Sequence, residues 1–132
     1  MLGTFDANDL PFVQIEVWGV NGTPKTLNAL VDSGYNSYLQ ITFVDAVPLG
    51  LVLEGVQPKT LADGSSKSNL VCRGMVKLDN KEVATTIDIT FGGKTLIGTR
   101  LLKELNKIFI LDCTSGKVEI KDNKLPQNGD KE

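Results

Sequence analysis

Short runs of alternating apolar and polar positions, separated by polar or glycine-rich turns, make up most of the chain and predict an all-β fold. The run from Phe12 to Val20 alternates as a half-buried strand does, and Asn21-Gly22 after it predicts a two-residue hairpin turn. The return strand runs from Thr26 to Val31. The first hairpin therefore delivers Asp32 to the point where a strand ends.

Similar runs continue to the end of the chain, with one interruption. Leu101, Leu102 and Leu105 recur at helical spacing, so Thr99 to Lys107 predicts the one convincing helix. Polar or glycine turns are expected at Asp79-Asn80-Lys81 and, as a hairpin, at Gly92-Gly93. The remaining expected strands are Tyr38 to Val47, Leu49 to Val56, a long hairpin around Asp63-Gly64-Ser65-Ser66 whose second arm is Ser68 to Leu78, Val83 to Phe91, Thr95 to Ile97, Ile108 to Leu111 and Val118 to Ile120.

The length of 132 residues suits a single domain, 1–132, whose last part, 122–132, reads as a polar and flexible tail. No internal repeat and no second domain is visible. The acidic residues in or beside the strands are most simply assigned to solvated faces, because carboxylates are seldom buried without a partner. These residues are Glu16, Asp45, Glu54, Asp79 and Asp88.

The composition excludes several classes of function. The chain has no histidine, which removes the Ser-His and Cys-His nucleophile pairs and the usual imidazole ligands of zinc. Cys72 and Cys113 form no paired metal-binding motif, and we expect two buried, reduced thiols, with a disulfide as the alternative. No metal and no cofactor is therefore expected.

Charge and hydropathy limit the partners. Fourteen basic and sixteen acidic residues give a net charge of -2, without a basic cluster that could track a phosphate backbone. No apolar run is long enough to span a bilayer, and the N-terminus shows no basic and apolar leader. We therefore expect no nucleic-acid partner, no membrane and a cytoplasmic location.

Asp32-Ser33-Gly34 is the strongest candidate for chemistry. A carboxylate can activate water for amide hydrolysis when a second carboxylate lies close enough to share one proton with it. The turn that presents such an acid needs a small hydroxyl residue for hydrogen bonding and a glycine for close backbone approach. Asp, Ser and Gly are also common in ordinary turns, so the tripeptide alone does not indicate catalysis. The segments around it have to distinguish a catalytic turn from a structural one.

The context is an apolar strand before the triad and, much later, the segment from Leu96 to Leu102, in which two apolar residues and Gly98 precede the expected helix. With this ordered pair of motifs, the sequence from Phe12 to Ile120 resembles the retropepsin-like aspartic proteases. The resemblance implies a closed β-barrel of retropepsin type with one short C-terminal helix.

The same resemblance implies roles for individual residues. Asp32 corresponds to the catalytic acid, Ser33 and Gly34 to the supporting turn, and Gly98 to the glycine that packs behind that turn. The hairpin tip falls where the family places its flap, which binds the substrate; its residues are Ala62, Asp63, Gly64 and Ser65.

A second Asp-Ser/Thr-Gly triad does not occur in the chain. An aspartic endopeptidase with this sequence would be a homodimer, in which two Asp32 carboxyls meet across a two-fold axis and act on a polypeptide substrate. The terminal strands are candidates for the interface between the two chains.

Two positions depart from the family pattern. Tyr35 stands where the family usually has a small residue, which makes it a pocket candidate that narrows the substrate site or shifts the loop. The acid that retroviral members place soon after the triad is absent, which leaves Arg100 open to another role. Two alternatives therefore stay open: a noncatalytic peptide-binding or dimerisation module with the same barrel, and an unrelated barrel in which Asp32 only shapes a turn.

Overall fold

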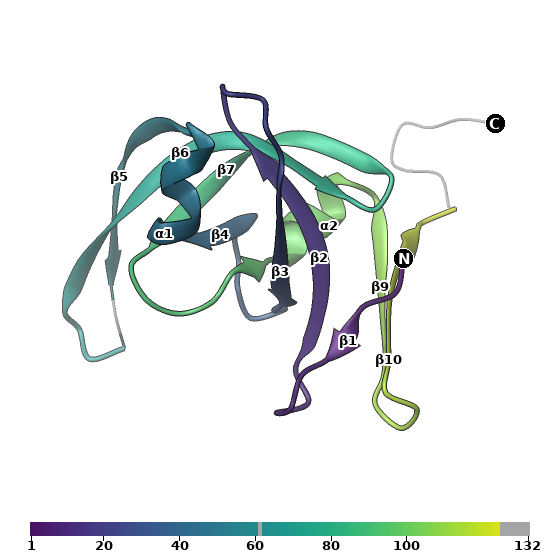
Figure 1. Ribbon diagram of the computed structural model, residues 1–132. Coiled ribbons are helices and arrows are strands. Elements are labelled where there is room, and N and C mark those ends of the chain that lie inside the picture. The colour runs from purple at the N-terminus through teal and green to yellow at the C-terminus, as the bar shows by residue number, and fades with distance from the viewer. Residues whose placement is uncertain (61, 125–132) are drawn as a thin grey trace.

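The chain folds into ten strands and three short helical segments, according to a computed structural model that describes residues 1–60 and 62–124 (Figure 1). The strands are β1 (Thr4–Phe5), β2 (Pro11–Trp18), β3 (Lys25–Val31), β4 (Leu39–Thr42), β5 (Val52–Thr60), β6 (Ser66–Leu78), β7 (Lys81–Thr90), β8 (Leu96–Ile97), β9 (Lys107–Asp112) and β10 (Lys117–Asp122). The helical segments are α1 (Phe43–Ala46), the 3₁₀ turn η1 (Val47–Leu49) and α2 (Thr99–Glu104). The predicted all-β class is confirmed.

The strands of the main sheet form a ring. The eight-stranded sheet has the order β1-β2-β3-β8-β4-β7-β6-β5, and an additional pairing joins β2 to β6. That pairing closes a circuit through β2, β3, β8, β4, β7 and β6. Most neighbours are antiparallel, but β8 runs parallel to β3 and β4 runs parallel to β7. These two short central strands pair with each other, and the segment that follows Asp32 leads from β3 into β4.

The core fills the ring with aliphatic side chains from alternating strand positions. Along β2, Val13, Ile15 and Val17 are buried while Gln14 between them is exposed, which is the period of two that a half-buried strand needs. On α2, Leu101 and Leu102 face the same core, together with Leu105 after it. The helix predicted from leucine spacing is thus confirmed, although it ends at Glu104, and Lys107 already begins β9.

The strand predicted from Tyr38 to Val47 is wrong beyond Thr42. β4 ends there and α1 begins, because the Thr42 Oγ1 accepts a hydrogen bond from the backbone N–H of Asp45 at 3.2 Å and caps the helix. Pro48 then occupies the first turn of η1, where its missing N–H leaves no donor unsatisfied. Leu49, expected to begin a strand, is part of this turn, and β5 starts at Val52.

Two predicted turns also differ from the structure. Asn21-Gly22 lies inside a longer connection, because β2 ends at Trp18 and β3 begins at Lys25. Gly92-Gly93 is not a hairpin turn, since β7 and β8 are separated by β4 in the sheet. Of the two free cysteines, Cys72 is buried as expected, whereas Cys113 is exposed in the turn between β9 and β10.

A second, two-stranded sheet of β10 and β9 carries the two ends of the described chain (Figure 1). The first three residues add to β10: the Gly3 N–H donates to the Val118 carbonyl, and the Ile120 N–H donates to the Met1 carbonyl, both at 2.9 Å. The outer edge of β9 has no partner strand within residues 1–60 and 62–124. No helix in this described part is long and apolar enough to cross a membrane.

A buried lysine fastens the second sheet to the first. The Lys107 side chain is fully buried, and its Nζ donates to Asp79 Oδ2 at 3.1 Å, Asn80 Oδ1 at 2.6 Å and Asp122 Oδ1 at 2.7 Å. Asp79 and Asn80 form the β6–β7 turn, and Asp122 ends β10. The hydrogen bonds from Lys107 and from Asn80 lower the pKa of Asp122 to about 2.

Replacing Lys107 by Met is expected to destabilise the protein by roughly 2 to 4 kcal/mol at pH 7, because two carboxylates lose their buried cation while each keeps some solvent. Since the pKa of Asp122 is lowered on folding, its stabilising contribution is complete above about pH 4 and is lost as the pH falls towards 2. Urea unfolding at pH 7, 4 and 2.5 should therefore show the difference between variant and wild type shrinking with acid. A difference that grows with acid would contradict this account.

Candidate active site

Asp32 sits immediately after β3, in a turn held by the backbone on both sides. Its N–H donates to the Ile97 carbonyl of β8 at 2.9 Å, and its carbonyl accepts from the Tyr35 N–H at 3.1 Å. Its Oδ1 accepts from the Gly34 N–H at 2.9 Å, which fixes the orientation of the carboxylate. The residue is half-buried, so it remains partly exposed to solvent.

Gly98 lies against the loop that follows this turn and leaves no room for a side chain. A Cβ at Gly98 would lie 2.0 Å from the Ser37 carbonyl oxygen and 2.6 Å from that of Tyr35. The Gly98 N–H donates to the Tyr38 carbonyl at 3.1 Å. Its φ of -90° is open to any residue, so close backbone approach, rather than an unusual conformation, is what requires glycine here.

Ser33 is the residue of the triad that supplies a hydroxyl group. It is exposed, and its hydroxyl makes no hydrogen bond to any residue that the structure describes. The hydrogen bond expected from the hydroxyl of this turn is therefore not made within one chain.

Tyr35 turns its side chain inward and fastens the loop to β7. Its hydroxyl donates to Asp88 Oδ2, and both residues are only 9% exposed. Burial and the hydrogen bond to Asp88 raise the pKa of Tyr35, so its hydroxyl stays a donor. The assignment of Asp88 to a solvated face was therefore wrong: a buried carboxylate needs a donor, and Tyr35 supplies it.

The residues predicted for a flap form the tip of the β5–β6 hairpin, which is continuous from Thr60↔Ser66 back to Val52↔Arg73 apart from one bulge at Leu53/Gly55. At the tip, Asp63 Oδ1 accepts from the N–H and the hydroxyl of Ser65, which lowers the pKa of Asp63. Ala62, Gly64 and Ser65 are exposed, while Leu61 lies outside the described residues.

In Figure 1 the tip of this hairpin and the tip of the β9–β10 hairpin both point to the bottom of the view, and the connection from β3 to β4 lies in the lower half of the molecule between them.

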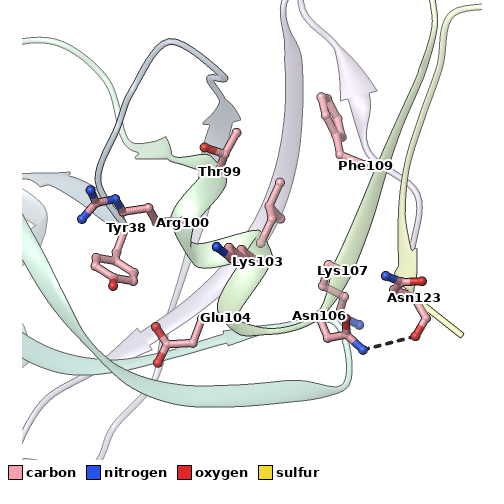
Figure 2. Close-up of a pocket in the computed structure, with 10 residues that line it drawn as sticks. Tyr38, Thr99, Arg100, Lys103, Glu104, Asn106, Lys107, Phe109 and Asn123 are labelled. Carbon is pink, nitrogen blue, oxygen red and sulfur yellow. Dashed lines mark hydrogen bonds between the residues drawn. The ribbon is translucent and has the colours of Figure 1, made fainter. Parts of the chain in front are cut away.

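Two hollows border α2, which follows Gly98. The larger, of about 1110 Å³, runs along α2 and β9 and is shown in Figure 2; its lining includes Arg100, Lys103 and Phe109 but not Asp32. A smaller pocket of about 260 Å³ lies between the loop after Asp32 and the β5–β6 hairpin, and Tyr35 and Asp88 line it. In the part of the chain described, no group of three or more potential metal ligands occurs.

Sequence reasoning missed Asp88, Gln57 and Asn69 as residues near the site. Alternation along β7 does place Asp88 on the face opposite the buried Ile87 and Ile89. Nothing in the local pattern shows that Tyr35 covers that face. The available signal was a tyrosine directly after the triad, where a small residue is usual. A buried tyrosine hydroxyl needs a hydrogen-bond acceptor nearby.

This arrangement of ring, turn and glycine is the retropepsin fold, and the sequence-based expectation of that fold is confirmed. Among solved structures, the chain is similar to the EIAV protease in complex with the inhibitor HBY-793, with a TM-score of 0.57 and 18% sequence identity over 82% of this chain and 99% of that one. No family model matches the sequence, and no curated protein sequence matches it. The likeness establishes the fold and excludes an unrelated barrel.

Proposed function

We propose that the protein is an aspartic endopeptidase that hydrolyses peptide bonds as a homodimer. The observation that carries this proposal is the place of Asp32: a half-buried carboxylate at the end of β3, held by a backbone turn against Gly98, in a fold shared with a retroviral protease. The expectations of a single domain and a cytoplasmic location form part of the same proposal.

The chemistry follows from bringing two such turns together. Two carboxyls about 3 Å apart cannot both ionise easily and hold one proton between them. The ionised Asp32 takes a proton from a bound water, whose oxygen attacks the peptide carbonyl, while the protonated Asp32 of the other chain gives its proton to the carbonyl oxygen. The C–N bond of the tetrahedral intermediate then breaks as the Asp32 that took the water proton gives it to the amine nitrogen, and a hydroxyl proton of the intermediate returns to the other Asp32.

Two surfaces of the single chain favour pairing with a copy of itself. The Ser33 hydroxyl has no hydrogen-bond partner among residues 1–60 and 62–124 and is available to the facing turn. The open edge of β9 exposes Ile108 and Leu111, 37% and 42% exposed, and its register with β10 is unbroken. An apolar, regular edge of this kind is a template for another strand.

The outer edge of β5, at the end of the main sheet, is less suited to pairing with another strand. β5 carries Pro58, which has no N–H to donate, and a bulge at Leu53/Gly55 that bends the strand. Apolar exposure does not separate the two edges, since Val52, Leu53 and Val56 of β5 are each more than half exposed. The proline and the bulge on β5, set against the unbroken register of β9, support β9 as the edge that meets the second chain. The β5–β6 hairpin is then left to close over an extended peptide.

The test is the cleavage of a denatured polypeptide at mildly acidic pH over a range of protein concentrations. Specific activity is expected to rise with protomer concentration and to follow the dimer fraction measured by sedimentation at the same concentrations. Turnover by a species that stays monomeric would contradict the shared active site.

The noncatalytic alternative was suggested by Tyr35. The burial of this side chain and the hydrogen bond from its hydroxyl to Asp88 support a structural role for the tyrosine that leaves the enzyme proposal open. That alternative predicts a stable dimer with no turnover and no affinity for a peptide mimic bearing a transition-state hydroxyl. Tight binding of such a mimic would support the endopeptidase and contradict the noncatalytic module.

A further inference from the structure

The smaller pocket beside the Asp32 turn is lined by the loop after that turn, by β5 and β6, and by one residue each of β7 and α2. Asn36 and Ser37 come from the loop after the turn, and Gln57 of β5 pairs directly with Asn69 of β6. Cross-strand partners point to the same face of a hairpin, so these two amides lie together on one side of the pocket. With a volume of about 260 Å³, the pocket can take one side chain.

The lining is polar, with one charge of each sign. Every lining residue except Pro58 has a side chain that can hydrogen-bond, and Asp88 and Arg100 carry the charges. Asp88 Oδ2 accepts from Tyr35, whereas Oδ1 has no partner in the described part of the chain and is not sealed from solvent. Arg100 is exposed and likewise makes no hydrogen bond or ion pair there.

The two charges select among possible occupants. An apolar side chain would take both charges out of water without replacing a hydrogen bond. A carboxylate would pair with Arg100 but be repelled by Asp88. A lysine or arginine would pair with Asp88 but be repelled by Arg100. A neutral carboxamide can satisfy both, because its NH₂ donates and its oxygen accepts.

We propose that this pocket is a subsite for the carboxamide side chain of a glutamine or asparagine in the substrate, with Asp88 accepting from its NH₂ and Arg100 donating to its oxygen. Tyr35 acts as a positioning residue, because its hydroxyl holds one carboxylate oxygen and leaves the other to the ligand. A two-fold dimer has two such pockets, so the preference applies on both sides of the scissile bond.

This inference rests on the proposed function, and a degenerate peptide library digested by the wild-type protein tests both. Glutamine or asparagine should be enriched at one position on each side of the cleaved bond. Matched single peptides with Gln, Glu, Lys or Leu at that position should show about 10- to 100-fold higher kcat/KM for Gln.

Two charge-removing variants make the test specific. Asp88→Asn keeps an acceptor for Tyr35 and removes the repulsion of a substrate glutamate, so discrimination against Glu should fall by about tenfold or more. Arg100→Gln removes the repulsion of a substrate lysine, so discrimination against Lys should fall by a similar factor. Arg73→Gln, an exposed change on β6 outside the pocket, is the control and should leave the preference unchanged.

The outcomes separate the two proposals. If the wild type cleaves peptides without a preference for carboxamides, or prefers aliphatic side chains, the subsite assignment is wrong and the peptidase assignment stands. Unchanged Glu and Lys discrimination in both variants would also overturn the subsite. If the wild type cleaves no peptide in the library, the proposed function fails, and the subsite fails with it.

Discussion

Replacement of Asp32 by Asn should lower peptide cleavage by roughly 10³-fold or more without unfolding the protein, because the amide can neither take a proton from water nor share one with the facing carboxyl. The change keeps an oxygen that can accept from the Gly34 N–H, so the turn itself is preserved. Cleavage of a fluorogenic peptide and the thermal midpoint should be measured on the same sample. Full activity in this variant would refute the catalytic role.

A mixing experiment tests the two-chain site with the same variant. When an about tenfold excess of Asp32→Asn chains exchanges with wild-type chains, most wild-type chains sit in hybrid dimers, and activity should fall about tenfold. Glu82→Gln, an exposed carboxylate-to-amide change in β7, is the matched control and should not inhibit. If excess Asp32→Asn leaves wild-type activity untouched, each chain works alone.

Gly98→Ala should be the most disruptive single methyl group in the chain near the site. The new Cβ would meet the backbone of Ser37 at 2.0 Å, and a backbone cannot rotate away as a side chain can. We expect a loss of about 3 kcal/mol in unfolding free energy and, in the folded fraction, a loss of about 100-fold in kcat from displacement of the Asp32 loop. Urea unfolding and active-site titration separate these two effects.

Gly92→Ala provides the matched control. Gly92 is exposed in the loop before β8, and a Cβ there meets nothing within 4 Å. This variant should fold and cleave as the wild type does, within about 0.5 kcal/mol. Equal behaviour of the two glycine variants would show that Gly98 is not held by close packing.

The strands and the helix α2 could be predicted because local periodicity follows burial. β2, β7 and the leucines of α2 each pack one face against the same core, so their apolar spacing is visible in the sequence. α1 was missed because its capping signal, Thr42 followed three residues later by Asp45, lies in a run rich in aromatic and β-branched residues. Over so short a stretch, one side-chain cap outweighs strand propensity.

The position of the candidate site could be predicted from the sequence for the same reason, because the Asp32 turn and Gly98 each follow an apolar strand whose spacing is visible. The Tyr35–Asp88 pair was not, because 53 positions separate the two residues and only the parallel pairing of β4 with β7 brings their segments together. The exposure of Cys113 and the burial of Lys107 depend likewise on where the β9–β10 hairpin is placed. Contacts of this kind belong to the topology rather than to any local pattern.

The single open edge of the second sheet also bears on how large an assembly can become. Residues 1–3 already occupy the far side of β10, so each chain offers that sheet only one place for a new strand. Two chains related by a two-fold axis would consume both places at once, and no third chain could add there. Pairing of the two β9 edges would thereby limit the assembly to a dimer and leave this apolar strand without an open edge at which a fibre could grow.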